Sequence, residues 1–289
     1  MNKVINIQDK EYPRLLKEAV KDAPKKLYYK GTWSSEIFEN CLAVVGSRRM
    51  TTYGRQVVNR VVSEIAAAGV TIVSGFMYGV DATSHRAAVN AGGRTIAVMP
   101  CGIDLIHPEY QEELYDDILK TNGLIVSEYA KDFAPALWTY PRRNRIVAGL
   151  CKAVLVVEAG LPSGSLITAR LAEKYGRKIF AIPGNITSEV SKGTSQLLKE
   201  GAVPVTCPKD ILEYYNMTVA DSIKSYENKT KLGALEKQIM EQLKAEPLEI
   251  DALARILKIS AAKIGTVLSL MQLAGLVFQE GAKYYINEK

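Results

Sequence analysis

Short apolar runs recur along the first two thirds of the chain, and stretches with helical periodicity separate them. The runs with the length of β-strands are Leu42–Val45, Val70–Ser74, Thr95–Met99, Leu124–Val126, Ala153–Val157 and Lys178–Ile182. The clearest helical stripe is formed by Val57, Val58, Val61, Val62 and Ile65. Alternation of strands and helices predicts right-handed βαβ units. We therefore expect an α/β fold with a mostly parallel sheet and helices on both faces.

The pattern changes on either side of this region. Residues 1–40 are expected to form an N-terminal lead-in packed against the main domain, residues 41–215, and the polar stretch 216–231 is expected to be a linker. Within residues 232–289, the predicted elements are helices at Leu232–Leu243, Glu249–Leu257 and Ser260 to about Ala274, and a hairpin at Leu276–Gln279 and Lys283–Ile286. Three short helices followed by a hairpin favour a winged-helix-like domain over a generic small helical domain.

Composition narrows the class of protein. With 289 residues, 47% of them hydrophobic, the chain can bury a full α/β core and still carry a small second domain. A net charge of +6 permits a nucleic-acid partner. The four cysteines form no C-x-x-C pair and are expected to be free thiols. The absence of a secretory signal pattern and of a long apolar run predicts a soluble, cytoplasmic protein with no membrane partner.

The ends of the predicted strands carry small residues that would meet at one edge of the sheet. The segments concerned are Gly46-Ser47-Arg48, Ser74-Gly75, Ser163-Gly164-Ser165 and Pro183-Gly184. Ligands bind at the carboxyl edge of a parallel sheet, where the chain connections diverge. Glycines at strand ends also occur simply as turn residues, so each of these segments alone says little.

A basic stretch adds a charge signal. No acidic residue lies between Phe133 and Val157, whereas Arg142, Arg143, Arg145 and Lys152 are all positive. Guanidinium groups bind phosphates, an aromatic ring such as that of Tyr140 can stack on a base, and amides at a helix start bind oxyanions. The pattern therefore points to nucleic acid. The alternative is that Tyr140 belongs to the core and the arginines form a solvated helix start.

Several other features favour a structural role. No G-x-G-x-x-G follows the first strand, so a dinucleotide cofactor is not indicated, and we expect no cofactor. Asp81 is expected to cap the helix that follows it. His85 and His107 have no Cys, His or Asp partner at metal-binding spacing, so both are expected to be structural and no metal site is predicted.

These motifs together resemble the DNA-processing protein A family, also called DprA or Smf. The segments that carry the resemblance are Val45-Gly46-Ser47-Arg48, Ser74-Gly75, Gly79-Val80-Asp81, Gly102-Ile103-Asp104, Ser127-Glu128-Tyr129, Pro141-Arg142-Arg143-Asn144-Arg145, Val157-Glu158-Ala159, Ser163 to Ala169 and Ala181-Ile182-Pro183-Gly184. The resemblance implies a Rossmann-like domain that binds single-stranded DNA, protects it and loads the RecA recombinase onto it in natural transformation. It also implies a homodimer and a C-terminal winged-helix-like domain. The mechanism that we expect is binding without bond cleavage.

The expected DNA-binding residues are Gly46, Ser47, Arg48, Gly75, Tyr140, Arg143, Asn144, Arg145, Ser163, Gly164, Ser165 and Thr168. In this interpretation the side chains of Arg48, Arg143 and Arg145 hold phosphates, and Tyr140 and Asn144 contact bases. Amides of the Gly46 and Gly164 loops, including those of Ser47 and Ser165, bind phosphate oxygens.

The sequence departs from the family motifs at three positions. Tyr140 stands where a Phe is usual, His107 where a Tyr is usual, and Met77 where a small residue is usual. The alternative function is a nucleotide-processing hydrolase of a related Rossmann-like fold. Pro183-Gly184-Asn185 lacks the second glycine of that hydrolase motif, and Glu158 is the strand-end carboxylate that such an enzyme would need. We expect Glu158 to orient an Arg or Ser side chain instead.

Charge is distributed unequally along the chain. The segment 232–289 contains as many Lys and Arg residues as Asp and Glu residues, so the net charge of +6 belongs to residues 1–231. The third predicted helix of this segment holds only Lys263 among apolar and small residues. A helix that docks in a DNA groove needs cationic side chains to offset phosphate charge. We therefore expect the C-terminal domain not to be the main DNA-binding element.

Overall fold

The computed structural model describes residues 3–19, 21, 23–218, 234–273 and 276–287. Its contacts divide the chain into two compact units, Met1–Tyr226 and Glu227–Lys289, which we describe separately. The predicted linker, 216–231, lies outside the described residues from position 219 onward.

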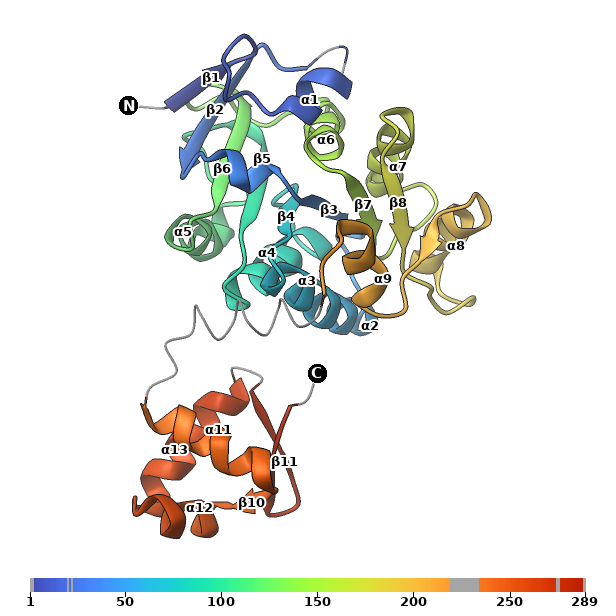
Figure 1. The fold of residues 1–289 in the computed structure, drawn as a ribbon. Helices are drawn as coiled ribbons and strands as arrows, with labels where there is room; N and C mark the ends of the chain where they lie inside the picture. Colours follow the sequence, from blue (N-terminus) through green and yellow to red (C-terminus); the bar gives the residue numbers. More distant parts are fainter. Residues whose placement is uncertain (1–2, 20, 22, 219–233, 274–275, 288–289) are drawn as a thin grey trace. The chain divides into compact units, whose positions relative to one another are not determined.

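The first unit is built on one large sheet (Figure 1). Its described strands are β1 (Lys3–Asn6), β2 (Lys26–Gly31), β3 (Cys41–Val45), β4 (Thr71–Ser74), β5 (Thr95–Gly102), β6 (Leu124–Tyr129), β7 (Ala153–Val156), β8 (Lys178–Ala181) and β9 (Val203–Pro204). Their spatial order is β1-β2-β6-β5-β4-β3-β7-β8-β9. Each of the six predicted strands is present, which confirms the predicted α/β sheet.

The strands from β6 through β9 in this order pair in parallel, as predicted. The chain starts the parallel sheet at β3, adds β4, β5 and β6 on one side, and then returns to add β7, β8 and β9 on the other side. The point where the order reverses is therefore the β3–β7 pair, in which Leu42 lies opposite Ala153 and Val45 opposite Val156. The carboxyl ends of these two strands mark the expected ligand edge.

The N-terminal segment corrects one expectation. The segment was expected to pack against the main domain as a lead-in, but it adds two strands to the sheet. Strand β2 pairs antiparallel with β6, and β1 pairs antiparallel with β2. Between them, Tyr12 and Leu16 are buried in the core, and Leu16 belongs to α1 (Arg14–Ala19). The sheet is therefore mixed at this edge.

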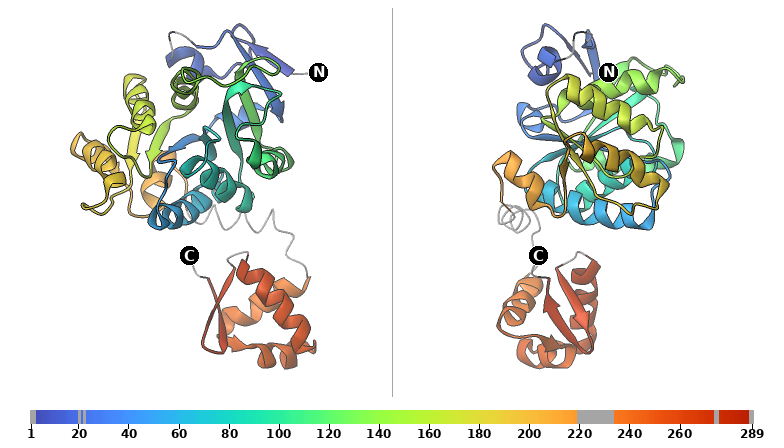
Figure 2. Two further views of the ribbon diagram at one scale, coloured as in Figure 1. Left: turned by 180° about the vertical axis from the view of Figure 1, so that it is seen from behind. Right: turned by 90° about the vertical axis from the view of Figure 1, so that its right-hand side faces the viewer.

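Helices cover both faces of the sheet (Figure 2). The described helices of the first unit are α1, α2 (Thr52–Val57), α3 (Ser63–Ala67), α4 (Val80–Asn90), α5 (Glu112–Lys120), α6 (Thr139–Leu150), α7 (Gly164–Lys174), α8 (Lys192–Lys199) and α9 (Lys209–Leu212). Alternate strand residues face opposite sides. In β3, Ala43 and Val45 pack with α6 and α7, whereas Leu42 and Val44 pack with α3 and α4.

The predicted apolar stripe at 57–65 forms one continuous helical segment with an irregular middle. A π-helical stretch, η2 (Val58–Val62), joins α2 to α3. Val58, Val62 and Ile65 are fully buried in the core, as the stripe predicts. Short 3₁₀ turns lie at η1 (Ser35–Phe38), η3 (Glu109–Gln111), η4 (Glu189–Ser191) and η5 (Glu213–Tyr215).

The second unit is a winged helix. Its described elements are α11 (Ala234–Ala245), β10 (Leu248–Glu249), α12 (Ile250–Leu257), α13 (Ala261–Leu273), β11 (Val277–Glu280) and β12 (Lys283–Ile286). The β11–β12 hairpin forms the wing, with Gly281 at its turn in a left-handed conformation, and β10 adds a third strand. Ile239, Leu253, Ile264 and Leu268 close a separate small core. The predicted helix end at Ala274–Gly275 lies outside the described residues.

Candidate nucleic-acid interface

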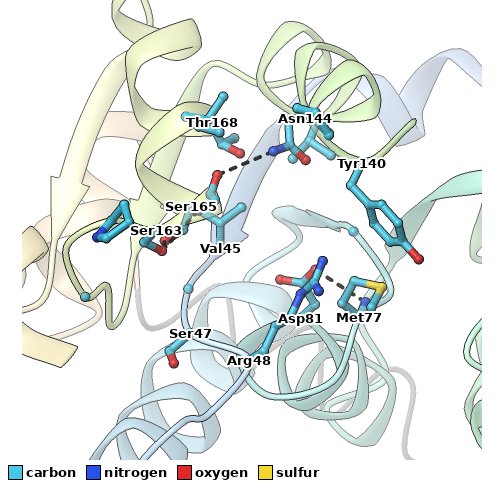
Figure 3. A pocket seen from close by; sticks show the side chains of 18 of the residues that line it. Val45, Ser47, Arg48, Met77, Asp81, Tyr140, Asn144, Ser163, Ser165 and Thr168 are labelled. Carbon is cyan, nitrogen blue, oxygen red and sulfur yellow. Dashed lines mark hydrogen bonds between the residues drawn. The ribbon is translucent and has the colours of Figure 1, made fainter. Parts of the chain in front are cut away.

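A hollow of about 620 Å³ lies at the carboxyl edge of the sheet, where the loops after β3 and β7 diverge. All of the predicted site residues except Arg145 line it. Figure 3 shows Ser163 and Tyr140 on opposite sides of the hollow, with Asn144 and Arg48 between them at its other two sides. The topological switch point thus brings together residues that lie far apart in the sequence.

Arg48, in the loop after β3, presents an exposed cation to the hollow, and the neighbouring Arg49 is also exposed and lines it. Its guanidinium carbon lies 5.2 Å from the centre of the Tyr140 ring and 5.8 Å from that of the Tyr78 ring. Both contacts are within the range of a cation–π interaction, which holds the guanidinium in place while leaving its N–H groups available to an anion. Sequence reasoning missed Tyr78, which is 42% exposed.

The loop after β3 is held close to the start of α4. The amide of Val80 donates to the carbonyl oxygen of Ser47 at 3.2 Å, and the amide of Arg49 donates to the Ser47 hydroxyl at 3.0 Å. Gly79 has φ of +76°, and a Cβ there would collide with the Ser47 carbonyl. Gly79 therefore permits the close approach that fixes the position of Arg48.

One face of α6 forms another wall. Tyr140, Asn144 and Val147 all line the hollow, at the four- and three-residue spacing that places side chains on one helix face. The Tyr140 hydroxyl lies 2.8 Å from Nε2 of His107, and the Asn144 amide group donates to the carbonyl oxygen of Gly164 at 3.4 Å. Contacts at both ends of this face thus orient the ring and the amide.

The start of α7 closes the opposite side. Ser163 is the N-cap, and its hydroxyl accepts from the Ser165 amide at 3.3 Å and lies 2.7 Å from the Ser165 hydroxyl. The Ser165 amide, which we expected to bind a phosphate oxygen, is therefore already used in capping. The hydroxyl groups and the positive end of the helix remain as the features that favour an anion here.

Arg143 lines the hollow, but its guanidinium points into the protein. The residue is 4% exposed, and Nη1 donates to the carbonyl oxygens of Gly75 and Val98. Burial lowers the pKa of Arg143 to about 10, so the group remains charged at neutral pH. A side chain committed to two carbonyls and screened from solvent does not act as an exposed phosphate clamp, and the expected role of Arg143 is corrected accordingly.

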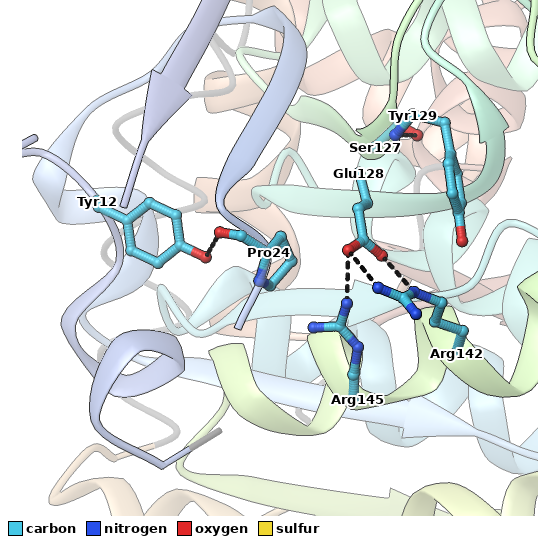
Figure 4. Close-up of polar contacts among 7 residues, drawn as sticks. All are labelled: Tyr12, Pro24, Ser127, Glu128, Tyr129, Arg142 and Arg145. Carbon is cyan, nitrogen blue, oxygen red and sulfur yellow. Dashed lines mark hydrogen bonds and ion pairs between the residues drawn. The ribbon is translucent and has the colours of Figure 1, made fainter. Parts of the chain in front are cut away.

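Arg145 lies outside the hollow altogether. Its side chain is 5% exposed and pairs at 2.6 Å with Glu128, which also binds Arg142 at 3.2 Å (Figure 4). Nearby, the Tyr12 hydroxyl donates to the carbonyl oxygen of Pro24 at 2.8 Å. The pair ties α6 to the end of β6, and the expectation that Arg145 holds phosphate is therefore also corrected.

Asp81 and Met77 are lining residues that sequence reasoning did not assign to the site. Asp81 lies in the first turn of α4, but the N-cap position is Gly79, and the Asp81 carboxylate accepts from the Met77 amide at 3.4 Å. It therefore braces the loop before the helix rather than capping the helix as expected. Burial raises its pKa, and the nearby Arg143 opposes that effect.

Glu158 follows β7 but is turned away from the hollow. It is 3% exposed and accepts from both the amide (2.9 Å) and the hydroxyl of Thr51, the residue that caps α2. Gly54 packs so closely that a Cβ there would meet the carboxylate at 2.6 Å. Glu158 thus orients a threonine rather than the expected Arg or Ser. Its carboxylate packs between Thr51 and Gly54.

The two histidines differ. His85 is fully buried, with Nδ1 2.7 Å from the Thr95 hydroxyl, and burial lowers its pKa to about 3, so it is neutral and structural as expected. His107 lies at the rim against Tyr140 instead. Among the described residues, no three His, Cys, Asp or Glu side chains form a group that could hold a metal ion. Cys41, Cys101, Cys151 and Cys207 are free thiols.

The described helices include none that is both long enough and apolar enough to cross a lipid bilayer.

Comparison with solved structures places the fold among DNA processing proteins. DprA from Streptococcus pneumoniae aligns with a TM-score of 0.68 and 39% identity over 73% of this chain and 74% of that one. DNA processing protein A from Helicobacter pylori, described for its single-stranded DNA binding mode, aligns with a TM-score of 0.66 and 33% identity over 74% of this chain and 96% of that one.

Sequence relatives agree. Protein Smf of Escherichia coli K12 is 44% identical over 201 residues, which are 70% of this chain but 53% of that protein, so the chain spans about half of its length. The DNA processing protein DprA of Bacillus subtilis is 39% identical over 209 residues, covering 72% of this chain and 70% of that protein.

Two family models match the chain in order. One, described as DNA recombination-mediator protein A, matches residues 3–216, and the other, described as the DprA winged helix domain, matches residues 224–283. The first match contains the whole sheet of the first unit and the hollow at the β3–β7 edge, and the second covers the separate winged helix up to the start of β12. The chain therefore belongs to the DNA recombination-mediator protein A family, also called DprA or Smf.

Proposed function

We propose that this protein binds single-stranded DNA in the hollow, without cleaving it, and delivers the strand to the RecA recombinase in natural transformation. The observation that carries the proposal is the exposed Arg48 guanidinium held against the Tyr140 ring, with the Asn144 amide and the start of α7 facing it. The single-stranded DNA binding mode described for the Helicobacter pylori relative supports the same reading.

Each wall of the hollow offers a different kind of contact to a strand. Arg48 supplies the phosphate contact, and the hydroxyls of Ser163 and Ser165 at the start of α7 supply a second anion-binding point. Tyr140 offers an aromatic ring for a base, and the Asn144 amide can hydrogen-bond a base edge. These contacts require bases that are splayed out of a duplex, so a single strand is the natural ligand.

The winged helix is not the principal contact in this proposal. Its α13 contributes Lys263 as its only basic residue, and segment 232–289 has no net charge. Groove docking by such a helix would leave phosphate charge uncompensated. We assign this domain to packing or to a protein partner.

A hydrolase is the weaker alternative. Such an enzyme needs a carboxylate that can reach a substrate or an attacking water. Glu158, the strand-end carboxylate that could take this role, is buried and bound to Thr51, and Asp81, which lines the hollow, already accepts from the Met77 amide. Binding without bond cleavage is therefore the function that the geometry supports best.

We further propose that the protein acts in the cytoplasm as a homodimer. Two hollows per dimer would hold one strand at two points, which raises the effective affinity without any new type of contact. Sedimentation of the protein alone and with a long strand would measure the stoichiometry, and a monomer with one strand site would remove this part of the proposal.

The test of the central proposal is a pair of anisotropy titrations with a labelled poly-thymidine strand and with a duplex of equal length. We expect tighter binding of the single strand, by about tenfold or more at equal salt, since stacking on an aromatic ring requires an unpaired base. Equal or tighter binding of the duplex would contradict the proposal.

A further inference from the structure

The rim of the hollow holds a contact that the proposed function does not use. Nε2 of His107, just before η3, lies 2.8 Å from the hydroxyl of Tyr140, at the start of α6. The two rings meet edge to face, with centroids 6.1 Å apart. Each side chain supplies the polar atom that the other contacts.

We propose that His107 is a positioning residue for the Tyr140 ring and that it couples the binding of a single strand to the uptake of a proton. This inference rests on the proposed function, because it concerns the same hollow.

The positioning part follows from how Tyr140 is held. The ring is fixed at its hydroxyl by His107 and on one face by the Arg48 guanidinium, 5.2 Å from the ring centre. An aromatic platform stacks well only when its orientation is set in advance, because ordering it on binding costs side-chain entropy. Loss of the His107 contact leaves the ring held on its face alone.

The proton coupling follows from the charges around His107. Partial burial and the positive charge of Arg48 lower its pKa, and Glu109, on η3, raises it. Tyr140 is the titratable group in direct contact with it. In the free protein the imidazole is therefore neutral at physiological pH.

Binding changes this balance. A phosphate paired with Arg48 cancels the charge that repels a proton from His107, so the pKa of His107 is higher in the complex than in the free protein. Because the pKa of the His107 imidazole rises on binding, its protonation strengthens the complex at pH values below the pKa that it has in the free protein. That gain is lost as the pH rises through the pKa of the complex.

The proposal is tested by titrating a labelled poly-thymidine strand into the full-length protein from about pH 5.5 to about pH 8 at constant ionic strength. The proteins compared are the parent, His107→Ala, His107→Gln, Tyr140→Phe and the double variant His107→Ala with Tyr140→Phe. Glutamine keeps a hydrogen-bonding group near the position of Nε2 but does not titrate, so it separates positioning from proton uptake. Thermal unfolding of each variant checks that it is folded.

We expect His107→Ala and Tyr140→Phe each to weaken binding by about three- to tenfold, with no further loss in the double variant, because both remove the same contact. His107→Gln should recover most of this affinity near pH 8. The parent should gain about three- to tenfold more affinity on acidification than His107→Gln does.

Two results would overturn the proposal. One is a pH profile of His107→Gln that matches that of the parent, and the other is additive losses in the double variant. Arg48→Ala in the same assay identifies where the failure lies. If Arg48→Ala binds as the parent does, the proposed function fails as well, whereas loss of binding in Arg48→Ala with parent-like His107 variants rejects the role of His107 alone.

Discussion

The guanidinium of Arg143 donates to the carbonyl oxygen of Gly75 and fills the space that a side chain at Gly75 would occupy. The loop after β4 and the middle of α6 are therefore locked together beneath the hollow. A Cβ at Gly75 would meet the guanidinium, so any other residue there would have to displace Arg143 from its present position. The basic residue that resembles a DNA contact in the sequence is thus part of the support for the site.

Replacing Arg143 should mainly reduce stability. Arg143→Ala leaves the carbonyls of Gly75 and Val98 without their donor and should lower the free energy of unfolding by about 2–4 kcal/mol. Chemical denaturation measures the loss. Arg142→Ala is the matched control on the same helix, since its side chain is 49% exposed and should cost less than about 1 kcal/mol. An equally mild effect of both changes would disprove the structural role of Arg143.

The Arg145–Glu128 pair should behave in the same way. Arg145→Ala removes a cation that is 5% exposed and leaves Glu128, 17% exposed, with its weaker pair to Arg142, so we expect a loss of about 1–3 kcal/mol in stability. Affinity for a single strand, measured on the folded fraction, should stay within about twofold of the parent because Arg145 does not line the hollow. A large loss of affinity without destabilisation would return Arg145 to the binding site.

Arg48 should contribute to binding rather than to stability. Arg48→Ala removes an exposed phosphate contact and should weaken single-strand binding about tenfold, for all sequences alike, while flattening the dependence on salt. Arg60→Ala is the control, because Arg60 is also exposed but does not line the hollow. Anisotropy titrations at several salt concentrations supply both quantities, and identical salt slopes for the two variants would argue against the assignment.

Removing the winged helix should leave the hollow functional. A chain that ends after residue 231 keeps every lining residue, as well as the whole excess of positive charge, and should bind a single strand within about threefold of the full-length affinity. Circular dichroism establishes that the shortened chain is folded. A drop as large as that of Arg48→Ala would assign the main DNA contact to the winged helix.

His85 should make stability depend on pH. Burial lowers its pKa to about 3 in the folded protein from the ordinary 6.5. Between these pH values His85 is protonated in the unfolded chain but neutral in the folded protein. The stability contributed by its neutral form is complete above pH 6.5 and is lost as the pH falls toward 3, by at most about 1.4 kcal/mol per pH unit. Urea unfolding of the parent and of His85→Gln between these limits measures it, and parallel curves would show that His85 does not titrate on unfolding.

The sequence predicted the centre of the sheet because its strands are continuous apolar runs buried on both faces. It did not predict β1 and β2, because their residues are mostly exposed or half-buried and carry no such run. Strand β9 consists of only two residues and contains Pro204, so it carries no strand pattern either.

Every site residue predicted from the sequence, with the exception of Arg145, lines the hollow, but the sequence did not predict where their side chains point. Helix α6 turns by about 100° per residue, so neighbours in its basic stretch face different surroundings. Tyr140 and Asn144 face the hollow, Arg143 faces the carbonyls below it, and Arg145 faces Glu128. The four-residue spacing of Tyr140 and Asn144 was the one signal that could have separated these roles. Contacts such as that between Thr51 and Glu158 join segments that are distant in the sequence, so no local sequence pattern could have predicted them.

The hollow straddles the pairing of β3 with β7, so its walls come from parts of the chain as far apart as Arg48 and Ser163. Contacts of such long sequence separation form slowly, because closing a long loop costs entropy before it gains anything. During refolding, Arg48 and Ser163 cannot face each other until β7 has docked on β3. The rate at which refolding protein binds a labelled strand would therefore report how fast β7 docks on β3. This measurement needs no probe attached to the protein.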